Sequence, residues 1–142
     1  MRILGLDVGE HRIGMAVSDP LGITAQGLGV LKRGKLNDDV ERLQALVRKY
    51  EVREIVVGLP RALDGGMGPQ ARKVADFASV LERKGLKVTF WDERFTTSAA
   101  ERYLIQANVG REKRRRVIDK LAAVLILQSY LDSRQAPEAG GA

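Results

Sequence analysis

Short apolar runs bounded by turn residues occupy the first part of this chain. They lie at residues 3–6, 12–18 and 23–31, and a glycine or proline stands in each connection. Runs of this kind are typical of β-strands, and short connections between strands indicate antiparallel pairing. The pattern predicts that the chain opens with a three-stranded antiparallel meander.

The rest of the chain alternates between helical and strand patterns. Apolar residues recur at helical spacing over residues 38–50 and 69–84, and short apolar strand patterns follow at 54–58 and 86–91. Asn37 is expected to cap the first of these helices, and Pro69 to begin the second. Two further helices are predicted at 98–108, after a capping box, and at about 113–133.

Strands that are separated by helices usually pair in parallel. We therefore predict an α/β fold with a mixed five-stranded sheet, in which two parallel strands join the antiparallel meander and helices flank the sheet. With 142 residues in all, one domain is expected over residues 1–134, and the low-complexity segment 135–142 is expected to be a disordered tail.

The composition excludes several classes of site. The chain has no cysteine, so disulfides and thiolate zinc sites are ruled out. It has neither the long apolar run of a membrane span nor the layout of a signal peptide. These observations predict a soluble, cytoplasmic protein with no membrane partner.

Positive charge is concentrated in one segment near the last helix. The formal net charge is +6, and residues 109–120 hold six basic residues against two acidic ones. The basic residues are Arg111, Lys113, Arg114, Arg115, Arg116 and Lys120. Such a cluster predicts a nucleic-acid partner, although a solvated helix face has the same composition.

Carboxylates stand at the ends of two predicted strands. Asp7 ends the first strand just before the turn at Gly9, and Asp92 and Glu93 end the fifth. The ends of parallel strands meet at one edge of a sheet, so these groups could share a ligand. Asp119 lies on the last helix among small and apolar residues, from which it could reach the same edge.

Carboxylates that crowd together repel one another unless a hard cation neutralises them. Mg²⁺ or Mn²⁺ ions, two in number, would suit phosphodiester hydrolysis at this edge. Other interpretations remain open, because Asp7 could simply close a turn and Asp119 could pair with Arg12. The single histidine, His11, is expected to be a surface residue next to the Asp7 turn.

Five ordered motifs resemble the YqgF/RuvX family, whose members are described as Holliday-junction-resolvase-like proteins and as pre-16S rRNA nucleases. The motifs are Asp7-Val8-Gly9 with Arg12-Ile13-Gly14, Val57-Gly58-Leu59-Pro60, Asp64-Gly65 with Gly68-Pro69, Asp92-Glu93-Arg94 with Thr96-Thr97, and Asp119 with Ala122-Ala123, Ile126-Leu127 and Tyr130. The resemblance covers residues 1–131. It implies an RNase H-like fold and a metal-dependent nuclease that uses Asp7, Glu93 and Asp119 to process the 5′ end of precursor ribosomal RNA.

Two features refine this hypothesis. Relatives with an RNase H-like fold often have an acidic residue at the end of the fourth strand, where this chain has Gly58-Leu59-Pro60, so Glu93 would have to take its place. Because consecutive strand residues point to opposite faces, Asp92 is expected to turn away from the site. Arg12 and the basic residues from Arg111 to Arg116 are predicted to contact nucleic acid.

Two other functions remain open at this stage. One is a resolvase of Holliday junctions or other branched DNA. The other is a non-catalytic RNA-binding factor of ribosome assembly, in which the basic helix would be the functional element and the carboxylates would be structural.

Overall fold

The structure, a computed structural model, describes residues 1–61, 64–93 and 110–135, except for the side chains of residues 111, 112, 114–120 and 135. The elements are β1 (Arg2–Val8), β2 (Arg12–Ser18), β3 (Ala25–Lys32), α1 (Leu36–Lys49), β4 (Val52–Leu59), α2 (Pro69–Arg83), β5 (Val88–Asp92) and α4 (Arg111–Gln135). The predicted helix at 98–108 and residues 136–142 of the predicted tail lie outside the described residues.

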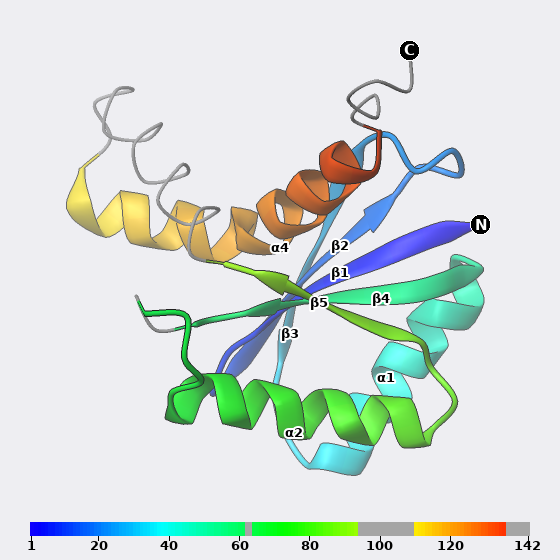
Figure 1. The fold of residues 1–142 in the computed structure, drawn as a ribbon, viewed down its shortest axis with the longest axis horizontal. Helices are drawn as coiled ribbons and strands as arrows, with labels where there is room; N and C mark the ends of the chain where they lie inside the picture. The colour runs from blue at the N-terminus through cyan, green and yellow to red at the C-terminus, as the bar shows by residue number, and fades with distance from the viewer. Residues whose placement is uncertain (62–63, 94–109, 136–142) are drawn as a thin grey trace.

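The five strands form one sheet in the order β3-β2-β1-β4-β5. The pairs β1–β2 and β2–β3 are antiparallel, whereas β1–β4 and β4–β5 are parallel. Helices α1 and α2 cover one face of the sheet, and α4 crosses the other (Figure 1). The predicted mixed sheet, with its meander and two added parallel strands, is confirmed.

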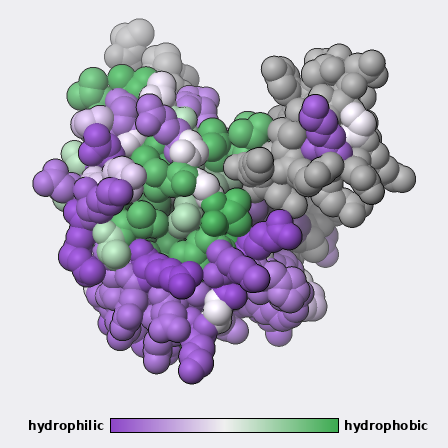
Figure 2. All heavy atoms as spheres, turned by 180° about the vertical axis from the view of Figure 1, so that it is seen from behind, coloured by the Kyte–Doolittle hydropathy of each residue, from purple (hydrophilic) through white to green (hydrophobic). Residues whose placement is uncertain are grey.

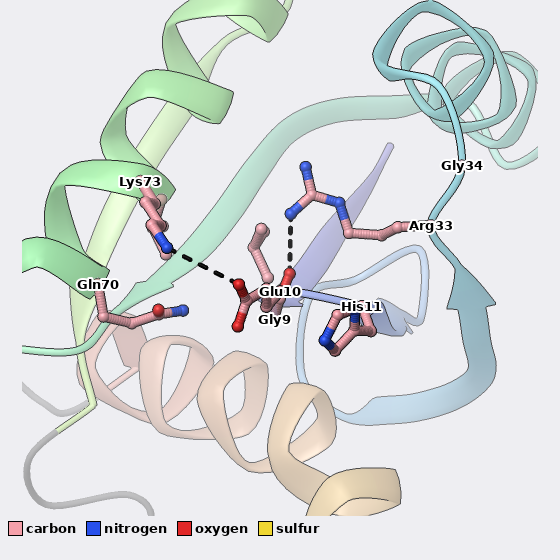
Figure 3. Close-up of a pocket in the computed structure, with 9 residues that line it drawn as sticks. Gly9, Glu10, His11, Arg33, Gly34, Gln70 and Lys73 are labelled. Carbon is pink, nitrogen blue, oxygen red and sulfur yellow. Dashed lines mark hydrogen bonds and ion pairs between the residues drawn. The ribbon is translucent and has the colours of Figure 1, made fainter.

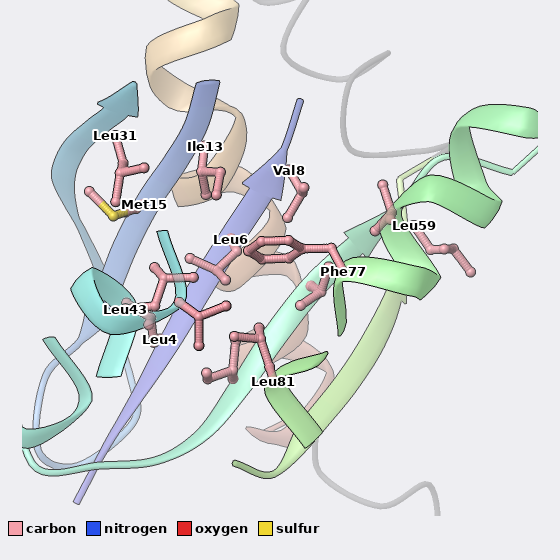
Figure 4. Packing of buried hydrophobic residues seen from close by; sticks show 14 of the residues in the cluster. Leu4, Leu6, Val8, Ile13, Met15, Leu31, Leu43, Leu59, Phe77 and Leu81 are labelled. Carbon is pink, nitrogen blue, oxygen red and sulfur yellow. The ribbon is translucent and has the colours of Figure 1, made fainter. Parts of the chain in front are cut away.

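Each face of the sheet has its own apolar cluster, because side chains alternate along the central strands. On the face of α1 and α2, residues such as Leu4 and Leu6 pack with Phe77 and Leu81 (Figure 4). On the face of α4, Ile3 belongs to a second cluster with residues of that helix. Burial on both faces explains why the central strands appear in the sequence as unbroken apolar runs.

Apolar and hydrophilic residues are unevenly distributed over the surface. From behind, apolar residues form a central patch that hydrophilic residues border on the left and below (Figure 2). No helix in the described part of the chain is both long enough and apolar enough to cross a membrane.

The predicted cap of α1 is wrong. The helix begins at Leu36, its N-cap residue is Lys35, and Asn37 lies within the first turn. The buried carboxylate of Asp39 explains the earlier start, because it accepts a hydrogen bond from the Gly34 N–H at 3.0 Å. This contact fastens the preceding loop onto the first turn and replaces a conventional cap.

Candidate active site

The carboxyl ends of β1, β4 and β5 lie side by side, since these strands are parallel neighbours. The pairing register, continued by one residue, sets Asp7 of β1 beside Gly58 of β4, and Gly58 is level with Trp91 of β5. Glu93 follows two residues after Trp91. Asp7 and Glu93 therefore approach Gly58 from its two sides.

Both carboxylates lie on the face of the sheet that α4 covers. Ile3 packs in the cluster beneath α4, and alternation along β1 gives Asp7 the same face. Glu93 reaches that face too, because its side chain and Ile126 of α4 both crowd the space above Gly58. Asp92 is near enough for its charge to raise the pKa of Glu93, and its expected turn toward the opposite face stays a prediction.

Gly58 makes this approach possible because it has no side chain. A Cβ atom at this position would lie 2.8 Å from Cγ and Cδ of Glu93 and 2.5 Å from Cδ1 of Ile126. Such distances are too short for carbon atoms, so any other residue would displace the side chains of Glu93 and Ile126. The glycine at the end of the fourth strand thus makes room for a carboxylate supplied by the next strand.

Substitution of Gly58 by alanine is expected to lower the free energy of unfolding by about 1–3 kcal/mol, because the added methyl group overpacks this contact. Urea denaturation would measure the loss. Gly34→Ala is the matched control, since a Cβ atom there meets nothing within 4 Å. Equal stability of the two variants would show that Glu93 and α4 do not depend on the gap above Gly58.

Asp7 and Glu93 are directly coupled. Burial, which has the largest effect, raises the pKa of Glu93 from 4.5 to about 8, together with the negative charge of Asp7, a hydrogen bond between the two side chains and the charge of Asp92. At neutral pH the pair therefore tends to hold one proton, which the hydrogen bond between the two side chains shares. Two carboxylates that must share a proton form a site in which a cation can take the place of that proton.

Asp119 lies on the part of α4 that extends toward this edge. Along β4, Glu54 accepts a hydrogen bond from the Tyr130 hydroxyl at 3.0 Å, while Gly58 lies against Ile126. α4 therefore runs antiparallel to β4, and its earlier residues lie progressively closer to the carboxyl ends of the strands (Figure 1). The side chain of Asp119 is outside the described residues, so its convergence with the pair stays a prediction.

Within the described part of the chain, no group of three or more histidine, aspartate and glutamate side chains is arranged to hold a metal ion. The described candidates at this edge are Asp7 and Glu93, and a third ligand would have to come from Asp119. Its alternative pairing with Arg12 stays untested for the same reason. Arg12 itself is exposed at the start of β2, and its carbonyl accepts a hydrogen bond from the Gly9 N–H at 2.8 Å.

The basic segment lies on the first turns of α4. Lys113 is exposed, and the side chains of Arg111 and Arg114–Arg116 lie outside the described residues. The segment and Asp119 belong to the same helix, as the sequence predicted.

Two basic residues near the site were missed by the sequence analysis. Arg33 and Lys73 line a cavity of about 330 Å³ beside the β1–β2 turn, on the face of α1 and α2. Neither residue belongs to the basic segment 109–120 or to one of the five motifs. The available signal was the position of Arg33 at the end of a strand that pairs with β2, next to the turn.

The chain is similar to proteins of one family over nearly its whole length. Residues 1–133 match the family model described as "RuvX: Holliday junction resolvase". A protein of Pelotomaculum thermopropionicum is 54% identical over 99% of this chain and 94% of its own length. One of Heliobacterium modesticaldum is 52% identical over 94% of this chain and 91% of its own length. Both carry the name "Putative pre-16S rRNA nuclease".

Solved structures give the fold. Thermus thermophilus RuvC, in complex with a Holliday junction substrate, aligns with a TM-score of 0.58 at 17% identity and covers 96% of each chain. At this identity the likeness concerns the fold alone. RuvC-like resolvases have an RNase H-like fold, so the predicted fold class is confirmed.

Proposed function

Since the chain belongs to the RuvX family of Holliday junction resolvases, we propose that it is a metal-dependent nuclease whose site is formed by Asp7, Glu93 and Asp119. The observation that carries this proposal is the Asp7–Glu93 pair, half-buried at the carboxyl ends of neighbouring strands and sharing a proton.

The residues present fit a divalent cation. Carboxylate oxygens are the ligands that Mg²⁺ and Mn²⁺ prefer, and the raised pKa of Glu93 reflects negative charge that a cation would neutralise. Asp7 and Glu93 would hold the metal, and Asp119 would complete the set. Two bound ions would supply an activated water and stabilise the leaving oxygen of the cleaved phosphodiester.

For the substrate, we favour precursor small-subunit ribosomal RNA, cleaved near its 5′ end. The names of relatives above 50% identity support this choice, and the basic turns of α4 would attract the polyanion. Such a substrate would place the enzyme in the cytoplasm. Branched DNA is the second candidate, because the RuvC structure of similar fold holds a Holliday junction.

One cleavage assay tests the proposal. RNA that carries a precursor 5′ extension and a four-way DNA junction would each be incubated with the protein in Mg²⁺, in Mn²⁺ and in EDTA. We expect RNA cleavage that needs metal. Preferred cleavage of the junction would support the resolvase instead. Binding of RNA with no cleavage in any condition would favour the non-catalytic assembly factor.

The basic turns of α4 are expected to bind the phosphate backbone. Changing Arg114, Arg115 and Arg116 to glutamine should reduce the salt slope of RNA binding by about 2 to 3 units, since each lost phosphate contact removes about 0.7 to 0.9. Affinity should fall alike for all sequences, with the cleavage position unchanged, because backbone contacts carry no base information. Binding measured at three salt concentrations would give the slope.

A charge-matched variant controls for the loss of net charge. Arg53, Lys84 and Lys87 are exposed at the opposite edge of the sheet, before or at the start of β4 and β5. Changing these three to glutamine should alter the slope by less than about one unit. If both triple variants behave alike, the α4 segment is only a solvated helix face.

A further inference from the structure

The cavity beside the β1–β2 turn lies on the face of the sheet opposite the carboxylate pair. It measures about 330 Å³, and the turn, the end of β3 and the first turns of α2 enclose it (Figure 3). Its polar lining residues are Glu10, His11, Arg33, Gln70 and Lys73. None of these residues takes part in the proposed metal site.

Arg33 is fixed as one wall of this cavity. Its Nη1 donates a hydrogen bond to the Gly9 carbonyl at 2.8 Å, its Nε lies 3.6 Å from Oδ2 of Asp39, and its guanidinium lies over the Phe77 ring. A guanidinium has five N–H donors in a rigid plane, so donors remain for a ligand. The contacts hold the group in place before any ligand arrives.

Lys73 and the start of α2 add positive potential. The α2 N-terminus has no side-chain cap and no acidic residue in its first turn, so its partial positive charge is not neutralised within the helix. The Lys73 ammonium lies 3.9 Å from a carboxylate oxygen of Glu10. Both side chains are about two thirds exposed, at 65% and 66%, so this ion pair is weak and a stronger anion can displace Glu10.

The cavity and the carboxylate pair are close along the backbone. Gly9 lines the cavity and follows Asp7 by two residues, a path of at most about 7 Å. A second cavity of about 580 Å³ shares Arg33 and Lys73 with the first and adds Arg83. A strand that leaves the carboxylate edge over the turn would thus meet one basic group after another.

We propose that the cavity beside the β1–β2 turn binds a phosphate group of the nucleic-acid strand whose scissile bond lies at Asp7. The strand bends over the turn, so that its two sides contact α4 and α2 on opposite faces of the sheet. Phosphate oxygens replace the Glu10 carboxylate and accept hydrogen bonds from Arg33 and Lys73. This assignment rests on the proposed function, because it takes nucleic acid as the substrate.

Two adjacent residues provide a matched test. Lys73 lines the cavity and Arg72, its neighbour on α2, is exposed and does not. With single-stranded RNA in EDTA, where no metal-dependent cleavage occurs, Lys73→Gln should weaken binding about fivefold at low salt and reduce the salt slope by about 0.7. Arg72→Gln removes the same charge and should change affinity by less than about twofold. Equal effects of the two variants would overturn the proposal.

Glu10→Gln supplies a test of opposite sign. Removing the competing carboxylate should tighten RNA binding about threefold, because Lys73 is then released to the phosphate. Such a gain cannot come from damage to the fold. Unchanged or weaker binding in Glu10→Gln would overturn the proposed exchange of ligands.

RNA with a 5′-hydroxyl and RNA with a 5′-phosphate would show whether the cavity binds an internal or a terminal phosphate. A loss in Lys73→Gln for both RNAs assigns an internal phosphate, and a loss confined to the phosphorylated RNA assigns a terminal one. Either result supports the site, while no loss for either RNA refutes it.

Failure of this inference is distinguishable from failure of the proposed function. Metal-dependent cleavage with no effect of Lys73→Gln on binding would leave the nuclease intact and remove the second site. Weaker binding in Lys73→Gln without any cleavage by the wild type would support the phosphate site and contradict the nuclease function. The cavity would then belong to a nucleic-acid-binding protein.

Discussion

Asp7→Asn is expected to lower the rate of metal-dependent cleavage by about a thousandfold or more, because the change removes a ligand charge at the point where the metal would be held. The amide keeps the size of the carboxyl group and can still accept the hydrogen bond from Glu93. Binding of RNA should change little, since the basic turns of α4 are not altered. Single-turnover cleavage with saturating protein would measure the rate apart from binding.

Asp38→Asn is the matched control, since Asp38 is exposed on the first turn of α1 and the same charge is lost. It should cleave at the wild-type rate. Asp119→Asn is expected to match Asp7→Asn, and wild-type activity in that variant would remove Asp119 from the site. Wild-type cleavage by Asp7→Asn would refute the proposed site of Asp7, Glu93 and Asp119.

The same variant separates a functional Asp7 from a structural one. In metal-free buffer Asp7→Asn should be at least as stable as the wild type, because Glu93 no longer faces the Asp7 charge that helps to raise its pKa. A clear loss of stability would favour the alternative in which Asp7 simply closes the turn.

The metal-free protein is expected to lose stability as the pH rises. The folded-state pKa of Glu93, about 8, lies above the value of 4.5 for a free glutamate, so the fold favours the protonated form. This contribution is fully present below about pH 4.5 and is lost as the pH rises through about 8. The loss between pH 5 and 8 should be on the order of 3 kcal/mol, since each tenfold change in proton affinity corresponds to ~1.4 kcal/mol and water screens part of the repulsion.

Urea unfolding in EDTA at pH 5 and pH 8 would test this prediction. The difference in stability between the wild type and Glu93→Gln should widen with pH, because glutamine has no proton to lose. Millimolar Mg²⁺ or Mn²⁺ should raise the melting temperature of the wild type more at pH 8 than at pH 5, since the cation competes with the Glu93 proton. A wild-type curve parallel to that of Glu93→Gln at every pH, with no effect of metal, would contradict the shared-proton site.

The sheet could be predicted almost completely from the sequence. The short apolar run of β1 and the tight turn at Gly9 require a return strand, and the helices before β4 and β5 require parallel crossovers. These are local or nearly local effects of side-chain pattern and chain connectivity. For the same reason Asp7, at the end of the first run, was recognisable as a strand-end carboxylate.

Details at the ends of elements could not be predicted from local pattern. Asn37 has the side chain of a helix cap, yet α1 begins before it, where the buried Asp39 carboxylate accepts a hydrogen bond from the Gly34 N–H of the preceding loop. The burial of Asp39 and its contacts with Gly34 and Arg33 outweigh the capping preference of Asn37.

For the site, the sequence by itself determined which carboxylates lie at the ends of parallel strands, and the tertiary structure decided which of them meet. Glu93, rather than Asp92, comes close to Gly58. The space that a side chain of Gly58 would occupy is taken by the side chains of Glu93 and of Ile126 from α4. The cavity of Arg33 and Lys73 likewise joins β3 to α2, which are distant in the chain. Contacts of this kind depend on how the elements are placed relative to one another. The periodicity of a sequence does not contain this information, because periodicity gives only the face of its own element on which each residue lies.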